Sequence, residues 1–186
     1  MPDRPRHRRR GQRAPLLVQV LRLVIFAGLT VGVATCGNAC AQDPLALGGR
    51  MPEFVERTVN GLSTGSDAMR GLPAVIWFTA FSEGTFEAMP ELKETCAKRP
   101  ALRLLVVSVN GEHAGRAAQF AQRFGVEART VVDTDGSTVR AFSGEFTQGV
   151  VPVSNLFLFD ASGHLRGRFH YPGVPPSVLG GQIESL

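Results

Sequence analysis

Cysteine is nearly absent from the part of the chain that we expect to fold. The sequence of 186 residues contains three cysteines. Two of them, Cys36 and Cys40, lie in an N-terminal leader, which leaves Cys96 as the single thiol of residues 42–186. An internal disulfide in these residues is therefore excluded, and so is a pair of cysteine ligands for a soft metal such as copper.

Positive charge is also scarce outside the leader. Residues 1–41 hold seven arginines and one acidic residue, whereas residues 42–186 hold 13 lysines and arginines against 15 aspartates and glutamates. The basic isoelectric point of about 9.5 therefore belongs to the leader. It gives no support to nucleic-acid binding by the folded part of the chain.

Clustered metal ligands are missing as well. His113, His164 and His170 have no ligand spacing to one another. The stretch Asp133-Thr134-Asp135-Gly136 starts like a calcium-binding loop but lacks the later acidic ligands, so we interpret it as a turn. We expect no metal and no other cofactor in this chain.

The leader, residues 1–41, has the pattern of an export signal. Met1–Arg22 is rich in arginine, and Leu23–Ala34 is an apolar run of signal-peptide length. Ala39-Cys40-Ala41 fits the small-x-small pattern before a cleavage site, with Gln42 as the new N-terminus. The positive flank keeps the N-terminus in the cytoplasm and directs the rest outward. We therefore expect an extracytoplasmic protein, either periplasmic or secreted.

Two other interpretations of the leader stay open. Leu16–Cys36 approaches the length of a membrane span if Arg22 snorkels to the interface, which would anchor the protein to the outer face of the cytoplasmic membrane. Val33-Ala34-Thr35-Cys36 is a weaker lipoprotein signal, because Val33 and Thr35 stand where leucine and a smaller residue are usual. In both cases, the leader alone would make the membrane contact.

Pro73–Pro90 is the stretch around which the chain is organised. The apolar run Val75–Phe78 predicts a buried strand, and Ser82-Glu83-Gly84 predicts a tight polar loop. A strand that leads through such a loop into a helix N-terminus is a common place for chemistry. The helix that follows has an apolar face formed by Met89, Leu92 and Cys96. Cys96 is therefore predicted to be a buried core residue and not a reactive thiol.

This stretch resembles the active-site segment of the thioredoxin superfamily, in particular that of exported proteins of the TlpA/ResA type. Their pattern is Phe-Trp-Ala-x-Trp-Cys-x-x-Cys-x-x-x-Met-Pro-x-Leu. Alignment on Met89-Pro90-Glu91-Leu92 places the two cysteines at Ser82 and Thr85, so both are replaced. A resemblance to redoxins of the AhpC/TSA type leads to the same position, because Thr79-Ala80-Phe81-Ser82 resembles their Thr-x-x-Cys, with Ser82 at the position of the nucleophilic cysteine.

The resemblance covers about residues 48–186 and implies an α/β protein with the thioredoxin fold. This is a central mixed sheet flanked by helices, here extended by an N-terminal β-hairpin. We divide the chain into the leader or anchor (1–41), a linker (42–50) and a thioredoxin-like domain (51–186).

Hydrophobic periodicity and turn residues predict the elements after the central strand and helix. These are strands at Leu102–Val109, Thr130–Val132, Leu156–Phe159 and Leu165–Tyr171, and helices at Ala114–Phe124 and Thr138–Phe142. Before the central strand, Glu53–Thr58 should pair with the residues after Asn60-Gly61 across a two-residue turn. Ser177 is predicted to cap a short closing helix.

In the family that this chain resembles, the first cysteine attacks a disulfide as a thiolate and the second resolves the mixed disulfide. Ser82 lacks a general base, so it cannot form the corresponding nucleophile at neutral pH, and Thr85 cannot resolve a disulfide. We expect Ser82 to cap the helix through its side chain, with Glu83 at the positive helix end. A serine-hydrolase site at Ser82 is disfavoured, because no positioned histidine or nucleophile elbow accompanies it.

The resemblance also implies a cis-proline that faces the active-site loop. Counting back from Leu156–Phe159 puts Ser154 at that position, with Pro152 two residues earlier. Either the proline is lost or the strand has shifted.

The sequence thus favours an exported, redox-inactive protein that acts as a monomer by binding an extracytoplasmic protein partner. The binding residues would be Phe81, Ser82, Glu83, Gly84, Thr85, Pro152 and Ser154. The alternatives are an oxidoreductase or peroxiredoxin-like enzyme that uses Cys96 with an external thiol, and an accessory factor of the methylamine-utilisation type.

Overall fold

A five-stranded mixed sheet forms the centre of the structure, a computed structural model that describes residues 43–109, 111–144 and 150–186. The strand order is β5-β4-β3-β6-β7. The strands are β3 (Ala74–Thr79), β4 (Arg103–Ser108), β5 (Thr130–Val132), β6 (Leu156–Phe159) and β7 (Leu165–Phe169). The pairs β3–β4 and β4–β5 are parallel, whereas β6 runs antiparallel to both β3 and β7.

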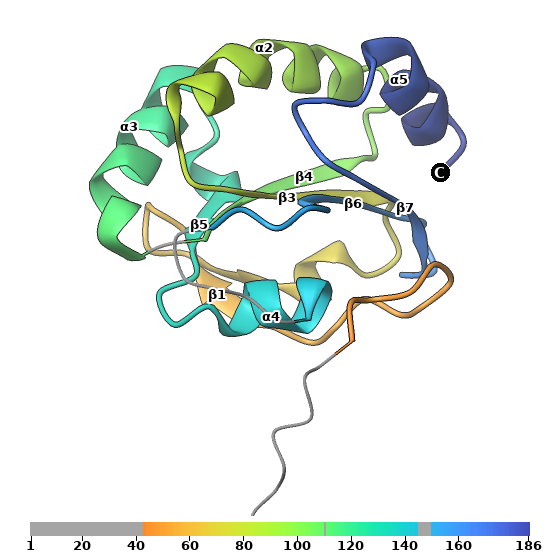
Figure 1. The fold of residues 1–186 in the computed structure, drawn as a ribbon, viewed down its shortest axis with the longest axis horizontal. Coiled ribbons are helices and arrows are strands. Elements are labelled where there is room, and N and C mark those ends of the chain that lie inside the picture. Colours follow the sequence, from red (N-terminus) through yellow and green to blue (C-terminus); the bar gives the residue numbers. More distant parts are fainter. Residues whose placement is uncertain (1–42, 110, 145–149) are drawn as a thin grey trace, which may run out of the picture. The chain divides into compact units, whose positions relative to one another are not determined.

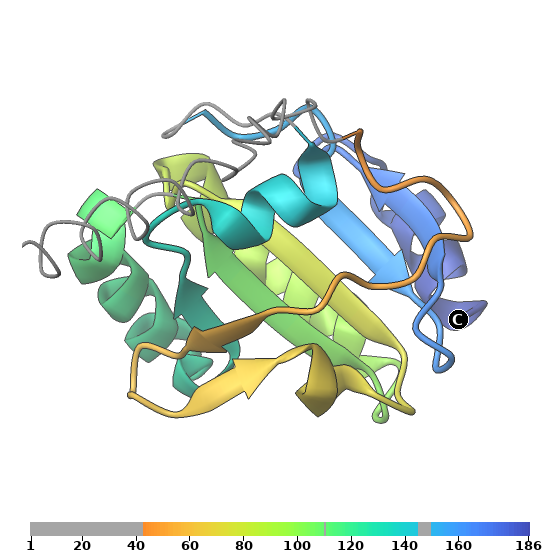
Figure 2. The ribbon, with the colours of Figure 1, turned by 90° about the horizontal axis from the view of Figure 1, so that it is seen from below.

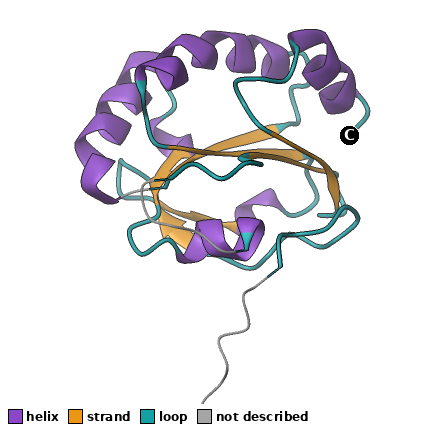
Figure 3. Ribbon diagram, in the orientation of Figure 1, coloured by secondary structure: helices purple, strands orange, loops and turns teal. Residues whose placement is uncertain are grey.

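Helices cover the upper face of the sheet in Figure 1. They are α2 (Glu83–Ala97), α3 (Ala114–Phe124) and α5 (Pro176–Glu184). Their apolar faces pack against alternate residues of the strands, including Val75 and Trp77 of β3. Figure 3 shows the same separation of helices and strands by colour.

The opposite face of the sheet is covered by smaller elements (Figure 2). They are the hairpin of β1 (Val55–Arg57) and β2 (Ser63–Gly65), the 3-10 turn η1 (Ser66–Met69) and α4 (Ser137–Ser143). Two further 3-10 turns, η2 (Gly111–His113) and η3 (Glu127–Arg129), flank α3. Ile76 and Phe78 of β3 point to this side, where they form a second core with Phe142 of α4. The predicted mixed sheet between helices, with its N-terminal hairpin, is thereby confirmed.

The hairpin turn differs from the prediction. Its last strand pair is Arg57 with Ser63, and the Thr58 amide donates to the carbonyl of Leu62, so the loop contains the three residues 59–61. Gly61 takes a left-handed conformation with φ of 84°. A three-residue loop that ends in a left-handed glycine matches the twist of the strands, which explains why Asn-Gly serves here in a longer turn.

Residues 43–50, which the sequence analysis interprets as part of a linker, lie against the sheet. The amide of Leu45 donates to the carbonyl of Phe142 in α4, and Gly48 and Gly49 exchange backbone hydrogen bonds with Leu165 at the edge of β7. This segment therefore covers part of an edge strand that would otherwise expose unpaired backbone groups.

Two element ends are corrected by the structure. α5 begins at Pro176 with Pro175 as its N-cap, so Ser177 lies inside the first turn and does not cap the helix. Proline suits this position, because its missing N–H would have no partner in the first turn. β7 ends at Phe169, two residues before the predicted Tyr171.

Asn155 immediately precedes β6 and joins three segments near the central loop (residues 80–84), which leads from β3 into the first turn of α2. Its side-chain amide donates to the carbonyls of Phe78 and Tyr171, at 3.2 and 2.8 Å, and its carbonyl oxygen accepts from the amide of Tyr171 at 2.7 Å. Asn155 is 2% exposed. The residue after β7 is thus held beside β3 by one polar side chain.

We expect Asn155→Ala to destabilise the protein strongly, because it leaves buried backbone groups of Phe78 and Tyr171 without partners. The loss should be about 3 kcal/mol, since each such group costs about 1–3 kcal/mol. Urea unfolding, monitored by circular dichroism, will measure this loss in the free energy of unfolding.

The matched control is Asn155→Asp, which keeps the acceptor for Tyr171 and loses the donor. At pH 7 it should lose at least as much stability as Asn155→Ala, because a buried carboxylate would face the carbonyl oxygens of Phe78 and Tyr171. A wild-type midpoint for Asn155→Ala would show that the network contributes nothing to stability.

Candidate functional site

The candidate site lies where β3 leads into α2. Phe81 precedes the helix in a left-handed conformation with φ of 52°, which is uncommon for a residue other than glycine. Its ring is fully buried and packs edge-on against Phe120 of α3, with ring centroids 4.8 Å apart. Burial of a large aromatic side chain offsets the cost of this backbone conformation. Phe81, predicted as a binding residue, therefore positions the loop and has no surface of its own.

Ser82 is the N-cap residue of α2, but its side chain does not cap the helix as predicted. It makes no hydrogen bond to a backbone amide of the first turn, and its Oγ lies 3.4 Å from Oγ1 of Thr85. The Ser82 hydroxyl lies near Thr85 because the two residues are three positions apart on the first helical turn, so their side chains face each other. Ser82 is exposed, whereas Thr85 is only 3% exposed.

A second hydroxyl pair continues from Thr85 into the protein. Oγ1 of Thr85 lies 2.6 Å from Oγ1 of Thr79, the last residue of β3, and both side chains are buried. A buried hydroxyl without a partner is costly, and each of these two threonines supplies the partner of the other. The hydroxyls of Ser82, Thr85 and Thr79 thus form a line from the surface to the core.

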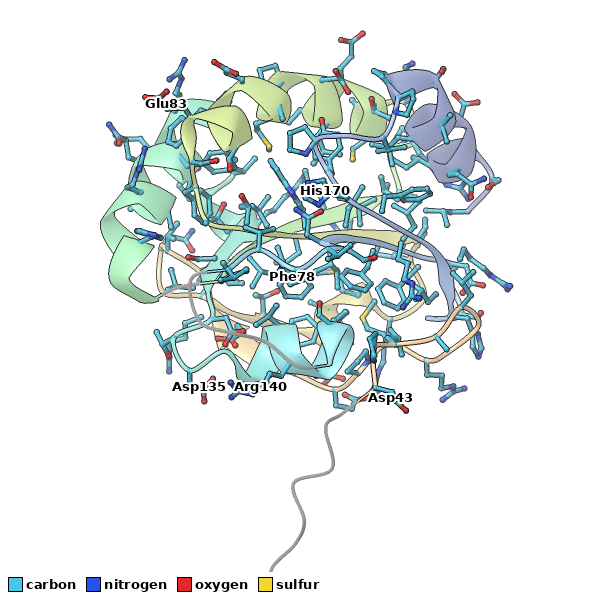
Figure 4. All side chains as sticks on the ribbon, in the orientation of Figure 1. Asp43, Phe78, Glu83, Asp135, Arg140 and His170 are labelled. Carbon is cyan, nitrogen blue, oxygen red and sulfur yellow. The ribbon has the colours of Figure 1, made fainter. Side chains whose placement is uncertain are left out.

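Glu83 and Gly84 complete the central loop on the surface. Glu83 is exposed in the first turn of α2, where the helix dipole favours a negative charge. Figure 4 shows it at the tip of the helix, far from Asp43 at the start of the described chain. Gly84 lines a hollow of about 400 Å³ together with Glu87 and Glu91 of α2 and the segment 171–176.

Pro152 and Ser154 lie in the segment that precedes β6, but they line a different hollow. This hollow, of about 420 Å³, is also formed by Pro44, Phe142 and Arg168, and none of residues 81–85 lines it. The cis-proline expected near Ser154 is absent, since the cis peptide bond found among the described residues joins Tyr171 to Pro172.

The segment after β7 is a part of the site that the sequence analysis missed. The hydroxyl of Tyr171 donates to the carbonyl of Ala88 in α2 at 2.9 Å, and its ring packs edge-on against Trp77 at 5.2 Å. Burial, helped by the nearby charge of Glu91, raises the pKa of Tyr171 well above its ordinary value. The available signal was Asn155, a polar residue within a buried apolar run, because such a side chain needs partners from another segment.

Cys96 is buried as predicted, with 9% of its surface exposed. Burial raises the pKa of its thiol to about 12, so the reactive thiolate is scarce at neutral pH. Cys96 lies 14 residues after Ser82 along α2, or about 20 Å at the helical rise per residue. The two residues therefore cannot act on the same atom.

His164 lies in the β6–β7 turn, whereas His170 lies next to Tyr171 and contacts the segment before β6. Nδ1 of His164 lies 2.8 Å from the hydroxyl of Ser162, and Nδ1 of His170 lies 3.1 Å from the carbonyl oxygen of Val153. In the described part of the chain, no three histidine, cysteine or acidic side chains converge as metal ligands. Nor is any helix in residues 43–109, 111–144 and 150–186 long and apolar enough to cross a bilayer. The leader lies outside the described residues.

Comparison with known proteins identifies the fold. No protein-family model and no curated protein matches the chain. Among solved structures, a secreted disulfide oxidoreductase of Mycobacterium tuberculosis, described as homologous to DsbE of E. coli, has a TM-score of 0.57 and 19% identity, and the match covers 72% of this chain and 96% of that one. A putative protein disulfide isomerase of Bacteroides thetaiotaomicron has a TM-score of 0.65 and 16% identity, with coverage of 78% and 92%.

A third structure, a putative thiol:disulfide interchange protein DsbE of Chlorobium tepidum, has a TM-score of 0.59 and 18% identity, with coverage of 76% and 97%. These matches confirm the thioredoxin-like fold that the motifs predicted. At such identities the likeness extends to the fold alone.

We expect Thr85→Val to destabilise the protein by about 1–3 kcal/mol, because it removes the partner of the buried Thr79 hydroxyl. Thr79→Val should cost less, since the hydroxyl of Thr85 keeps that of Ser82 at 3.4 Å. The double variant should be close to the wild type, since valine has the shape of threonine and removes both polar groups. A double-mutant cycle from urea unfolding will measure the coupling. Additive losses would mean that the two hydroxyls do not depend on each other.

Proposed function

We propose that this protein is an exported member of the thioredoxin-like proteins that has lost thiol–disulfide exchange and acts by binding a protein partner beside Ser82. The observation that carries this proposal is the buried hydrogen bond between Thr79 and Thr85. Thr85 stands where the resemblance implies the resolving cysteine, and its hydroxyl is hydrogen-bonded to the hydroxyl of Thr79. The site is therefore adapted to hydroxyl groups and not to sulfur.

The chemistry of the site supports the loss of exchange. Disulfide exchange needs a thiolate, and the exposed position is occupied by Ser82. The hydroxyl of Ser82 lies near Thr85, which is no base, so nothing in this pair activates it. The remaining thiol, Cys96, is buried and its pKa is raised to about 12 by that burial.

The surface around the loop supports partner binding. Ser82 and Glu83 are exposed, and Gly84 leads into the hollow that ends at Pro176. On the segment before β6, Val153 is 87% exposed beside Ser154. We place the contact with the partner at these exposed groups.

We expect the variant Ser82→Cys, Thr85→Cys to form an intramolecular disulfide on mild oxidation and to gain measurable reduction of insulin with dithiothreitol. Both residues lie on one helical turn with hydroxyls 3.4 Å apart, which is compatible with the ~4.4–6.8 Å between Cα atoms that a disulfide accepts. The helix dipole will lower the pKa of a thiol at position 82, with Glu83 opposing it.

The assay uses full-length protein with Cys36 and Cys40 replaced by serine and Cys96 by alanine. The protein that retains Ser82, Thr85 and Cys96 is the control, and it should stay at background. Exchange by this control at rates typical of oxidoreductases would refute the proposed loss of activity. A folded double variant that never closes the bond would show that Ser82 and Thr85 do not occupy the cysteine positions.

Export and partner binding can be tested together by photo-crosslinking in the native host. A photoreactive amino acid at position 82 should give a discrete protein adduct in the extracytoplasmic fraction, because we place both the site and the partner there. The same amino acid at Arg57, an exposed residue of the hairpin, is the control. Equal adducts at both positions, or protein confined to the cytoplasm, would contradict the proposal.

A further inference from the structure

Asp133 is a buried carboxyl group with one unpaired oxygen. It follows β5 and is 1% exposed. Its Oδ2 accepts a hydrogen bond of 2.8 Å from the amide of Val139 in α4. No donor among the described residues reaches its Oδ1. An ionised carboxylate leaves such an oxygen unsolvated, whereas a protonated carboxyl uses it as a donor.

Two further carboxyl groups lie in the elements around Asp133, and the charges of the three groups act on one another. Oε1 of Glu56, in β1, accepts a hydrogen bond of 2.6 Å from the hydroxyl of Thr138 in α4. Asp135 lies in the turn before α4, where its Oδ1 accepts from the amide of Ser137 at 2.8 Å. The cation in this group is Arg140, which donates to the backbone carbonyl of Asp135 at 2.9 Å (Figure 4).

The carboxyl groups of this cluster influence one another's protonation. Burial raises the pKa of Asp133, and the hydrogen bond to Val139 opposes this only in part. Burial also raises the pKa of Glu56, with the charges of Asp133 and Asp135 adding to the effect. Hydrogen bonds from Ser137 lower the pKa of Asp135, so it is the acceptor for a proton carried by Asp133. These three carboxyls do not converge as ligands for a metal ion.

We propose that Glu56, Asp133 and Asp135 form a proton-dependent latch that holds the hairpin β1–β2 and α4 against β5. With a proton between Asp133 and Asp135, one negative charge is removed and the free oxygen of Asp133 gains a partner. When that proton leaves, charge repulsion separates Glu56 from the turn and weakens its bond to Thr138. The latch closes at mildly acidic pH and loosens as the pH rises.

The sign of the pH dependence follows from linkage. A free aspartate has a pKa of about 3.9. A group whose pKa is higher in the folded state contributes stability that is complete below its unfolded pKa. This contribution is lost as the pH rises through the folded value, so the latch should weaken as the pH rises above about 4.

The test is hydrogen exchange of the full-length protein at pH 5 and pH 8, corrected for the intrinsic pH dependence of amide exchange. In the wild type, protection of the peptides that contain β1 and α4 should be lower at pH 8 than at pH 5, because the proton that closes the latch has left. Asp133→Asn should keep that protection at pH 8, since an uncharged amide can accept from Val139 and donate to Asp135.

Asp160→Asn is the matched control. Asp160 also sits in a turn and accepts hydrogen bonds, from Ser162, His164 and Arg166. Although burial opposes them, these bonds hold its pKa below its ordinary value. Removing this carboxylate should destabilise the β6–β7 turn at neutral pH and leave the pH dependence of α4 unchanged.

Two measurements keep the proposal decidable if Asp133→Asn does not fold. Glu56→Gln retains an acceptor for Thr138 and should reduce the loss of protection at pH 8. The carboxyl ¹³C resonance of Asp133 in the wild type should titrate above that of a free aspartate. Titration at or below the ordinary value, or weaker protection of Asp133→Asn than of wild type at pH 8, would overturn the latch.

Discussion

The burial of β3 is the constraint on which the rest of the structure depends. All six of its residues are buried, because it lies in the middle of the sheet with helices on one side and the hairpin and α4 on the other. Val75 and Trp77 contribute to one core, and Ile76 and Phe78 to the other. A strand held on both faces and both edges delivers its last residue, Thr79, to a single position. The loop and the start of α2 are positioned from there.

The central loop places a pair of hydroxyl side chains at the start of α2. One side chain of the pair, Ser82, is open to solvent, and the other, Thr85, is closed within the protein. A buried thiol needs no hydrogen-bond partner, but a buried hydroxyl does. Thr79 satisfies that need at 2.6 Å. The hydroxyl pair of Thr79 and Thr85 therefore extends the candidate site from the loop into β3.

Polar side chains join the elements on both faces of the sheet. Near the site, Asn155 ties the end of β6 to Phe78 and to Tyr171, which in turn contacts α2. On the other face, Glu56 and Asp133 connect the hairpin and β5 with α4. Each of these groups is at least partly withdrawn from water, so its hydrogen bonds bear on the stability of the elements that it joins.

The sequence by itself determined the fold and the lack of sulfur at residues 82 and 85. The apolar run of β3 and the helix that buries Cys96 follow from local periodicity, and periodicity survives in any tertiary context. Likewise, Ser82 and Thr85 lack sulfur wherever they lie. The length of the hairpin turn and the bounds of α5 depended on which backbone groups form hydrogen bonds, and the residues adjacent in the sequence do not specify this.

Only the tertiary structure decided which distant side chains meet. It paired Thr85 with Thr79 and left Ser82 without a capping hydrogen bond to α2. It placed Tyr171 and the segment up to Pro176 beside Gly84 of the loop, whereas Ser154, where the resemblance implies a cis-proline, lines another hollow. Asp133, which the sequence analysis interpreted as part of a turn, is a buried acid whose charge acts on Glu56. These outcomes depend on burial, since a hydroxyl or carboxyl selects its partner only when water is excluded, and burial is a property of the packed chain.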